Sequence, residues 1–179
     1  AYASANLPKA GWRDTHIAAH DVNGESLISA RLVVAHGNFA LENYQVAQAG
    51  YESLLRIMPA KDERVQALTN RLAATFFQQS ERLLASAKVK QTLAAPLPEG
   101  RNVAQLSETQ RRAVIDSVAF LQRIMQETPN STFRAAAQYD AATYLLASEN
   151  FTQALPLLLD FQTRFPKNDL VLSIPGKLL

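Results

Sequence analysis

The chain has 179 residues, of which 47% are hydrophobic and 19% are charged, and its 18 basic residues exceed its 16 acidic residues by two. This is the composition of a folded globular protein, and so small a positive excess does not predict a nucleic-acid partner. The absence of cysteine excludes disulfides, thiolate catalysis and cysteine-ligated metals, and no apolar run approaches the roughly 20 residues that cross a bilayer.

Helix is the secondary structure that the composition favours, because alanine and leucine are plentiful while only 6 glycines and 8 prolines are present. The start of the chain is the exception, since Pro8, Gly11 and the pair Asn23-Gly24 interrupt it. We therefore predict an irregular N-terminal segment over residues 1–25, with room for a short helix around Trp12–His20.

A helical hairpin is predicted next. From Ser26 onward, apolar and small residues recur at spacings of three and four, and Asn43 ends this helix because asparagine tolerates the left-handed conformation found at helix C-termini. A second helix runs from about Gln45 to Ile57 and stops before Pro59, because a proline disfavours the α conformation of the residue before it. Two helices joined by so short a turn form an antiparallel pair, which is the building unit of α-solenoids.

The middle of the chain is predicted to hold one long helix and one loop. Apolar residues mark one face of a helix over about 62–89. Residues 91–106 then contain Pro96, Pro98 and Gly100, and this clustering predicts a loop.

Three helices are predicted after this loop. The first starts at Ser107, which can form a capping box with Gln110, and it stops before Pro129. The other two cover about 132–147 and 152–165.

Both ends of the chain suggest that it is part of something longer. Residues 170–179 begin like a helix that Pro175-Gly176 cuts short, and the chain starts AYAS, without methionine. We therefore expect a processed or excised piece, in which residues 170–179 are the start of a truncated further element.

Two stretches of the chain are copies of one another. Residues 35–62, AHGNFALENYQVAQAGYESLLRIMPAKD, align without a gap with residues 142–169, ATYLLASENFTQALPLLLDFQTRFPKND. The identical positions include Ala35 and Ala142, Glu42 and Glu149, Asn43 and Asn150, Ala47 and Ala154, and Pro59 and Pro166. Because a unit of this size cannot bury its apolar face alone, the repeat predicts units that stack on their neighbours.

The copies resemble the tetratricopeptide repeat, a helix-turn-helix of about 34 residues with small residues, aromatics and a helix-ending proline at fixed offsets. The matching residues are Ala35, Tyr44, Ala47, Tyr51 and Pro59 in the first copy, and Ala142, Phe151, Ala154, Leu158 and Pro166 in the second. The family's tryptophan is missing, and its glycine before the turn is replaced by Glu42 and Glu149.

This resemblance is clear over residues 28–62 and 110–169 and weak between them. It implies an all-α fold in which antiparallel helix pairs stack into a right-handed superhelix, an α-solenoid that covers residues 26–169. The run from Glu127 to Asp169 is also similar to repeats of bacterial cell-envelope proteins, a group that includes outer-membrane assembly lipoproteins and the Tol-Pal coordinator. That similarity implies a periplasmic or outer-membrane-associated location, and the cytoplasm stays open as an alternative.

The sequence contains no P-loop, no dinucleotide fingerprint and no nucleophile elbow. His16 and His20 are four residues apart and could share a metal on one helix face, but the glutamate of an H-E-x-x-H motif is missing. A surface helix is the more frequent explanation of such a pair. We therefore predict no catalytic residue, no metal and no cofactor.

The family resemblance also implies where a partner binds, because the first helix of each pair lines the concave face. The corresponding positions include Ser29 and His36 in the first copy and Tyr139 and Thr143 in the second. Histidine and tyrosine combine contact area with a polar group. We therefore expect a non-enzymatic scaffold that binds a protein or peptide partner on a concave helical surface.

Two other interpretations stay open. The chain could be the α-helical domain of an enzyme or of a protein that binds a small ligand, with His16, His20 and His36 near the site, or it could be a structural spacer between domains. Self-association through the C-terminal repeat is a further expectation, because large apolar residues crowd the last predicted helix.

Overall fold

The computed structural model describes the backbone of residues 12–178 and the side chains of residues 24–177, and every regular element in this part is helical. The elements in chain order are α2 (Trp12–Ala40), α3 (Tyr44–Ile57), α4 (Val65–Ser86), α5 (Val89–Ala94), α6 (Glu108–Glu127), α7 (Arg134–Ala147), α8 (Phe151–Arg164), the 3-10 helix η1 (Asp169–Ser173) and α9 (Ile174–Leu178). The expected all-α fold is confirmed.

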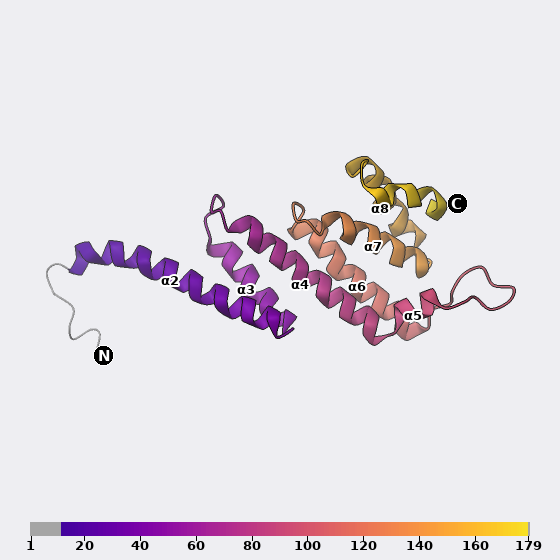
Figure 1. Ribbon diagram of the computed structural model, residues 1–179, viewed down its shortest axis with the longest axis horizontal. Helices are drawn as coiled ribbons and strands as arrows, with labels where there is room; N and C mark the ends of the chain where they lie inside the picture. Colours follow the sequence, from indigo (N-terminus) through magenta and orange to yellow (C-terminus); the bar gives the residue numbers. More distant parts are fainter. Residues whose placement is uncertain (1–11, 179) are drawn as a thin grey trace.

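The long helices pack in the order of the chain (Figure 1). Helix α2 packs on α3, α3 on α4, α4 on α6, α6 on α7, and α7 on α8. We name the pairs α2–α3, α4–α6 and α7–α8 the first, second and third hairpins. Most of the core is one continuous cluster that runs from Ala35 to Ala154, because each helix presents apolar residues to the helix before it and to the helix after it.

The two sequence copies fold into hairpins with the same turn. In the first hairpin the Asn43 N–H donates to the Asn38 carbonyl at 2.8 Å and the Glu42 N–H donates to the Phe39 carbonyl at 3.0 Å. The third hairpin has the same two bonds at the same distances, from Asn150 and from Glu149. This pair of bonds is a Schellman motif, which pairs the last free carbonyls of a helix.

The Schellman motif requires one residue in the left-handed conformation, and in both hairpins that residue is a glutamate. The φ angle is 61° at Glu42 and 62° at Glu149. The prediction that Asn43 would take this conformation is wrong, since its φ is −79° and it is the N-cap of α3. Each glutamate side chain pairs with an arginine of the second hairpin, Glu42 with Arg82 and Glu149 with Arg111.

Small residues let the two helices of each hairpin approach closely. Ala47 and Ala154 are both 0% exposed. In the first hairpin a Cβ added to Gly50 would lie 3.0 Å from the Cβ of Ala35, a separation with little room for a larger side chain. The hairpin geometry therefore depends on the small residues that the two copies share.

The N-terminal part differs from the prediction. Helix α2 begins at Trp12, so the predicted irregular segment is wrong for residues 12–25, and residues 1–11 lie outside the described part of the chain. The helix continues through Asn23-Gly24 because a glycine in a helix interior costs only about 1 kcal/mol, which a helix of 29 residues tolerates.

The predicted long helix over 62–89 is interrupted at Lys88, which has a φ of 55°. Helix α4 ends before it and α5 begins after it, so the loop predicted over residues 91–106 starts only at Ala95. The break turns Val89, which is 0% exposed, into the core. The side-chain amide of Gln110 holds the break, because it donates to the Ala87 carbonyl at 3.1 Å and to Thr92 Oγ1 at 2.6 Å.

The capping box at the start of α6 is confirmed. The Gln110 N–H donates to Ser107 Oγ at 3.2 Å, and the Ser107 N–H donates to Gln110 Oε1 at 3.0 Å. Gln110 therefore caps α6 with one end of its amide and holds the start of α5 with the other.

The C-terminal residues form a short cover on the third hairpin. Ile174 is 0% exposed and lies in one cluster with Ala142, Leu158 and Phe161. The expectation that Pro175-Gly176 cuts the helix short is wrong, because α9 runs through both residues to Leu178. Pro175 lies in the first turn of α9, where a helix needs no N–H donor.

Replacing the small residues at the hairpin crossings tests this packing. We expect Ala47→Leu and Ala154→Leu each to lower the free energy of unfolding by about 1–3 kcal/mol, because neither site has room for the added atoms. Chemical denaturation measures this, with Ala119→Leu at an exposed position of α6 as the matched control. Equal stability of all three variants would contradict the crossing geometry.

The two glutamates in the left-handed conformation give a second test. A residue with a Cβ is strained there by about 1–2 kcal/mol, and glycine loses part of this advantage to its more flexible unfolded state. We therefore expect Glu42→Gly and Glu149→Gly each to be more stable, by roughly 0.5–1 kcal/mol, than the alanine variant at the same position, which lacks the same ion pair. The controls are Glu42→Ala and Glu149→Ala, which remove the carboxylate and keep the strain. Thermal melts in which the glycine variants are no more stable than the alanine variants would rule out strain at these turns.

Candidate functional site

The four residues predicted to line a concave face lie on two first helices. Ser29 and His36 belong to α2, and Tyr139 and Thr143 belong to α7. Figure 1 shows α4 and α6 between these two helices, so the structure does not bring the four residues together into one pocket. Each of them therefore has to be considered in its own surroundings.

His36 lines a cavity between the first helices α2 and α4. The cavity has a volume of about 320 Å³, and its lining residues are Leu32, His36, Arg64, Ala67, Leu68 and Arg71. Its floor is apolar, because Leu68 is only 2% exposed and belongs to the continuous core. Its rim carries two arginines.

The two arginines of this cavity differ in whether carboxylates of the described residues neutralise their charge. Arg64 is bound by two carboxylates, through an ion pair with Glu25 and one with Asp62 at 2.8 Å. The hydrogen bonds from Arg64 lower the pKa of Asp62 to about 2. Arg71 is exposed, stacks on the Phe39 ring at 5.4 Å from its centroid, and has no ion pair with a residue of the described part. Arg71 is therefore the charge of this cavity that is available to a ligand.

The surroundings of His36 favour its neutral form. Its Nδ1 lies 2.7 Å from the hydroxyl of Tyr51, which is 0% exposed, and the two rings are 5.5 Å apart. Burial of this side of the ring lowers the pKa of His36 from its usual value of 6.5, and the guanidinium of Arg71 lowers it further. The other side of the imidazole faces solvent, so His36 offers a neutral polar group next to the cation of Arg71.

Tyr139 is occupied by the C-terminal residues of the chain. Its hydroxyl is hydrogen-bonded to Ser173 Oγ, the ammonium of Lys177 lies 5.3 Å from its ring centroid, and its ring lies 5.7 Å from that of Phe161. Tyr139 therefore helps to fix η1 and α9 on the third hairpin, and this contact could not be deduced from the repeat alone.

The remaining two predicted residues have little around them that identifies a ligand. Ser29 is exposed on α2. The hydroxyl of Thr143 is buried and has no hydrogen-bond partner in the part of the chain that the structure describes.

A cluster of ionisable groups at the junction of α4, α5 and α7 is absent from the sequence-based prediction. Lys90 forms an ion pair with Glu81. Asp140 and Tyr144 lie close enough to this pair for electrostatic interactions with it. Burial raises the pKa of Asp140, the charge of Glu81 raises it further, and that of Lys90 opposes both. The one available signal was that Asp140 is the only acidic residue of α7.

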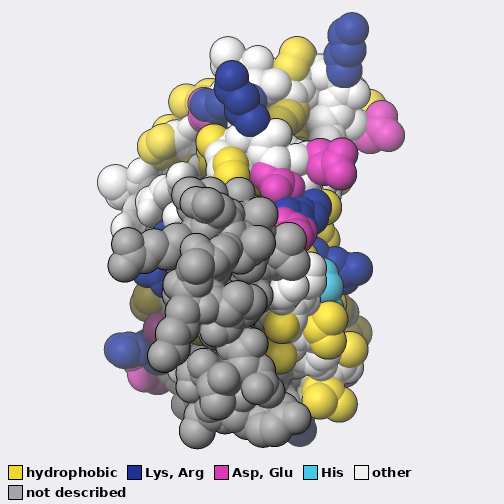
Figure 2. Space-filling view, turned by 90° about the vertical axis from the view of Figure 1, so that its left-hand side faces the viewer, with side chains coloured by type: hydrophobic (Ala, Val, Ile, Leu, Met, Phe, Trp, Pro, Cys, Tyr) yellow, Lys and Arg dark blue, Asp and Glu magenta, His cyan; other side chains and the backbone are white. Residues whose placement is uncertain are grey.

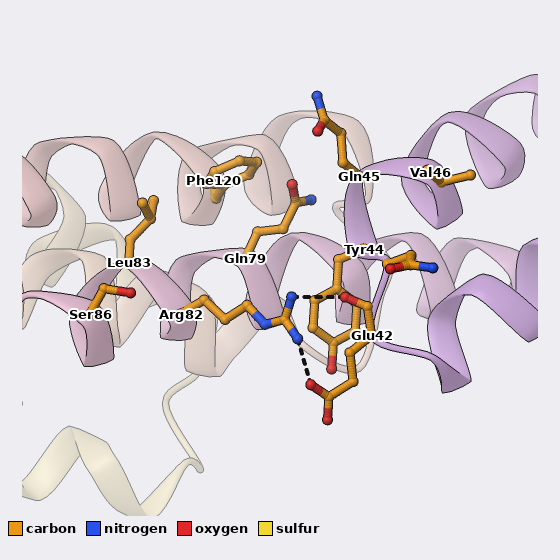
Figure 3. Close-up of a pocket in the computed structure, with 10 residues that line it drawn as sticks. Glu42, Tyr44, Gln45, Val46, Gln79, Arg82, Leu83, Ser86 and Phe120 are labelled. Carbon is orange, nitrogen blue, oxygen red and sulfur yellow. Dashed lines mark hydrogen bonds and ion pairs between the residues drawn. The ribbon is translucent and has the colours of Figure 1, made fainter.

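A second hollow, of about 580 Å³, lies beside the turn of the first hairpin (Figure 3). Arg82 crosses it, donating to the Glu42 carbonyl at 2.8 Å and to the Glu42 carboxylate, and its guanidinium lies 4.5 Å from the centroid of the Tyr44 ring. The charges of this hollow are thus paired with one another, which makes it a structural contact between the first and second hairpins.

The side chains of residues 24–177 contain no group of three or more histidine, aspartate or glutamate side chains that could hold a metal ion. His16 and His20 lie on α2, and their side chains are outside the described residues. Within residues 12–178 there is also no helix with the length and the apolar character needed to cross a membrane.

Comparison with known proteins gives no relative: no family model, no curated protein and no solved structure matches this chain.

The neutral state of His36 predicts a pH dependence of stability. Because the pKa of His36 is lower in the folded chain than in the unfolded one, the unfolded chain binds more protons, and stability falls as the pH drops below about 6.5. We expect the free energy of unfolding to decrease between pH 7 and pH 5 less steeply in His36→Gln than in the wild type. Denaturation at a series of pH values measures the difference, and parallel curves for the two proteins would show that His36 is not held neutral.

Proposed function

We propose that this chain is a non-enzymatic, tetratricopeptide-like scaffold that binds a peptide segment of a partner protein along its first helices. The proposal includes the right-handed superhelix and the envelope location that the family resemblance implies. The observation that carries it is the cavity between α2 and α4, which joins an apolar floor to the cation of Arg71, a side chain without an ion pair to any described residue.

The chemistry of this cavity defines the peptide that would fit. Leu32, Ala67 and Leu68 offer an apolar surface to one side chain, and burying an apolar side chain contributes about 1.5–3 kcal/mol. Arg71 offers donors to a carboxylate, in a position where the neutral His36 adds no competing charge. A peptide with an apolar residue next to an acidic residue is therefore the expected ligand.

A phage-displayed library of random peptides tests this proposal on the chain as it stands. We expect enrichment of peptides that combine an apolar residue with an acidic one, and NMR shift changes that map to α2 and α4. A charge-assisted hydrogen bond is worth about 1.5–3 kcal/mol, so Arg71→Glu should weaken binding of an enriched peptide by roughly 10-fold to 100-fold.

The matched control is Arg112→Glu on α6, which removes an exposed arginine whose ion pair is with Asp116, at 3.5 Å. Its peptide affinity should equal that of the wild type. If no peptide is enriched, or if binding survives in Arg71→Glu, the cavity between α2 and α4 is not a peptide site. The role of a structural spacer is then the better explanation.

A further inference from the structure

Among the side chains that the structure describes, residues 24–177, none covers an apolar groove on the outer side of the first hairpin. It has a volume of about 400 Å³ and lies between α2 and α3, and we name it the entry groove. Its lining residues are Ala30, Arg31, Val34, Ala35, Val46, Ala49, Gly50 and Ser53. Val34 is 61% exposed and Val46 is 55% exposed. Figure 2 views the molecule from this end, where hydrophobic side chains are exposed beside the residues drawn in grey.

The other two hairpins show what covers this surface. Residues 35–62 align with 142–169, and extending this alignment backwards by a few positions makes Ala30 and Val34 the counterparts of Ala137 and Ala141. Both of these alanines are 0% exposed, because the second helix of the preceding hairpin, α6, packs on α7. In the third hairpin the corresponding surface is therefore an interface.

The second hairpin repeats this arrangement. The N–H of Val65 donates to the Asp62 carbonyl as the N–H of Arg134 donates to the Ser131 carbonyl. This register makes Leu68 and Leu72 of α4 the counterparts of Ala137 and Ala141. They are 2% and 4% exposed, because α3 packs on α4. A first helix is thus covered by a second helix wherever a hairpin precedes it.

Large apolar side chains are exposed at the opposite end of the molecule, on α8. Helix α8 exposes Phe151, Leu155 and Leu159, which are 61%, 46% and 48% exposed. Their spacing of four residues places them along one side of the helix, and we name them the exit stripe.

In the first hairpin, the positions of the exit stripe are contacts to the next hairpin. The counterparts on α3 are Tyr44, Gln48 and Glu52. Tyr44 lies under Arg82 of α4, Gln48 accepts a hydrogen bond from Gln79 of α4 at 2.8 Å, and Glu52 accepts one from Arg123 of α6 at 2.8 Å. The exit stripe therefore occupies the place of an interface, with large apolar residues where α3 has mainly polar ones.

The C-terminal residues cover only part of α8. Helix α9 and η1 pack on Leu158 and Phe161, which are the counterparts of Tyr51 and Leu54 of α3. They leave the exit stripe exposed, so a helix that lies beside α9 can still reach it.

We propose that copies of this chain associate head to tail, with the exit stripe of one copy against the entry groove of the next. The contact continues the series of interfaces inside the chain, because α8 is the second helix of its hairpin and α2 is the first helix of its own. Large side chains on α8 meet small ones at the groove, which is the size relation that lets helices pack closely. A contact between two different surfaces forms a ring if its rotation closes and an open chain if it does not. The hairpins stack along one direction, so we expect an open chain of copies whose mass grows with concentration.

The contact is expected to be weak. Three apolar side chains and a shallow groove bury less than the roughly 1,600 Å² of a standard interface, so a micromolar or weaker dissociation constant is expected. Sedimentation equilibrium over a concentration range that extends above this value measures it. We expect the average mass to rise from that of the 19.7 kDa monomer without a fixed stoichiometry.

Two variants, each blocking one surface, provide the decisive experiment. Val34→Glu places a charge in the entry groove, and Leu155→Glu places one in the exit stripe; both sites are exposed, so both variants should fold. Each should be monomeric alone. Mixed in equal amounts they should form a 1:1 dimer and nothing larger, because the intact stripe of one variant fits the intact groove of the other. Ile115→Glu, which replaces an exposed residue on α6, should associate as the wild type does.

Every other result overturns the proposal. A monomeric wild type would mean that another protein, or another part of a longer chain, occupies these surfaces. Association that survives in either variant, or a mixture of the two that stays monomeric, would mean that copies meet through another face or do not meet. Neither Val34 nor Leu155 lines the cavity of Arg71, so peptide binding there should be unchanged in both variants, and a failure of this proposal is distinguishable from a failure of the proposed function.

Discussion

The burial of each first helix under the second helix of the hairpin before it is the contact on which the fold depends. Leu68 and Leu72 of α4 are buried under α3, and Ala137 and Ala141 of α7 are buried under α6. A helix with one apolar stripe must hide that stripe against another helix, and here the partner is always the nearest one in the chain. The elongated shape in Figure 1 is a consequence of this rule, since each further hairpin adds to the end of the stack.

The turns that close the first and third hairpins each contain a residue in an unfavourable backbone conformation. Glutamate has no preference for the left-handed conformation that Glu42 and Glu149 adopt, yet the same two backbone bonds close both turns. Both side chains reach arginines of the second hairpin, Arg82 and Arg111. A glycine would relieve the strain and lose these links, and exposed ion pairs of this kind contribute at most about 1 kcal/mol. The turns therefore combine backbone strain with weak contacts that join the outer hairpins to the middle one.

The repeat in the sequence was sufficient to predict the first and third hairpins, because a gap-free alignment places the same small residues and the same final proline in both. It was insufficient for α2 and for Lys88. The start of α2 depends on a glycine that a long helix tolerates, and the break at Lys88 depends on contacts of Val89 and Gln110 that are distant in the sequence. Local propensity carries no information on such contacts.

The same limit applies to the candidate site. The repeat pattern placed His36 on a first helix, and the structure adds the cavity beside it and the cation of Arg71 on α4. It could not predict that Ser173 of η1 and Lys177 of α9 would contact Tyr139, because both residues follow the second copy and lie outside the aligned repeat. The sequence also could not predict the cluster of Glu81, Lys90 and Asp140. This cluster depends on the break at Lys88, which places Lys90 of α5 near Asp140 of α7.

The second helices of the two copies, α3 and α8, carry different kinds of side chain at equivalent positions. On α3, the side that faces the next hairpin carries Gln48 and Glu52, which form hydrogen bonds across the interface. On α8 the same side carries Leu155 and Leu159, which remain about half exposed. Burial alone would predict the reverse, with the polar residues at the open end of the stack. A surface that stays in water gains nothing from leucine, and neighbouring exposed apolar residues promote association. The exchange of polar for apolar residues between equivalent helices is therefore the basis on which we propose that the outer side of α8 is a contact surface.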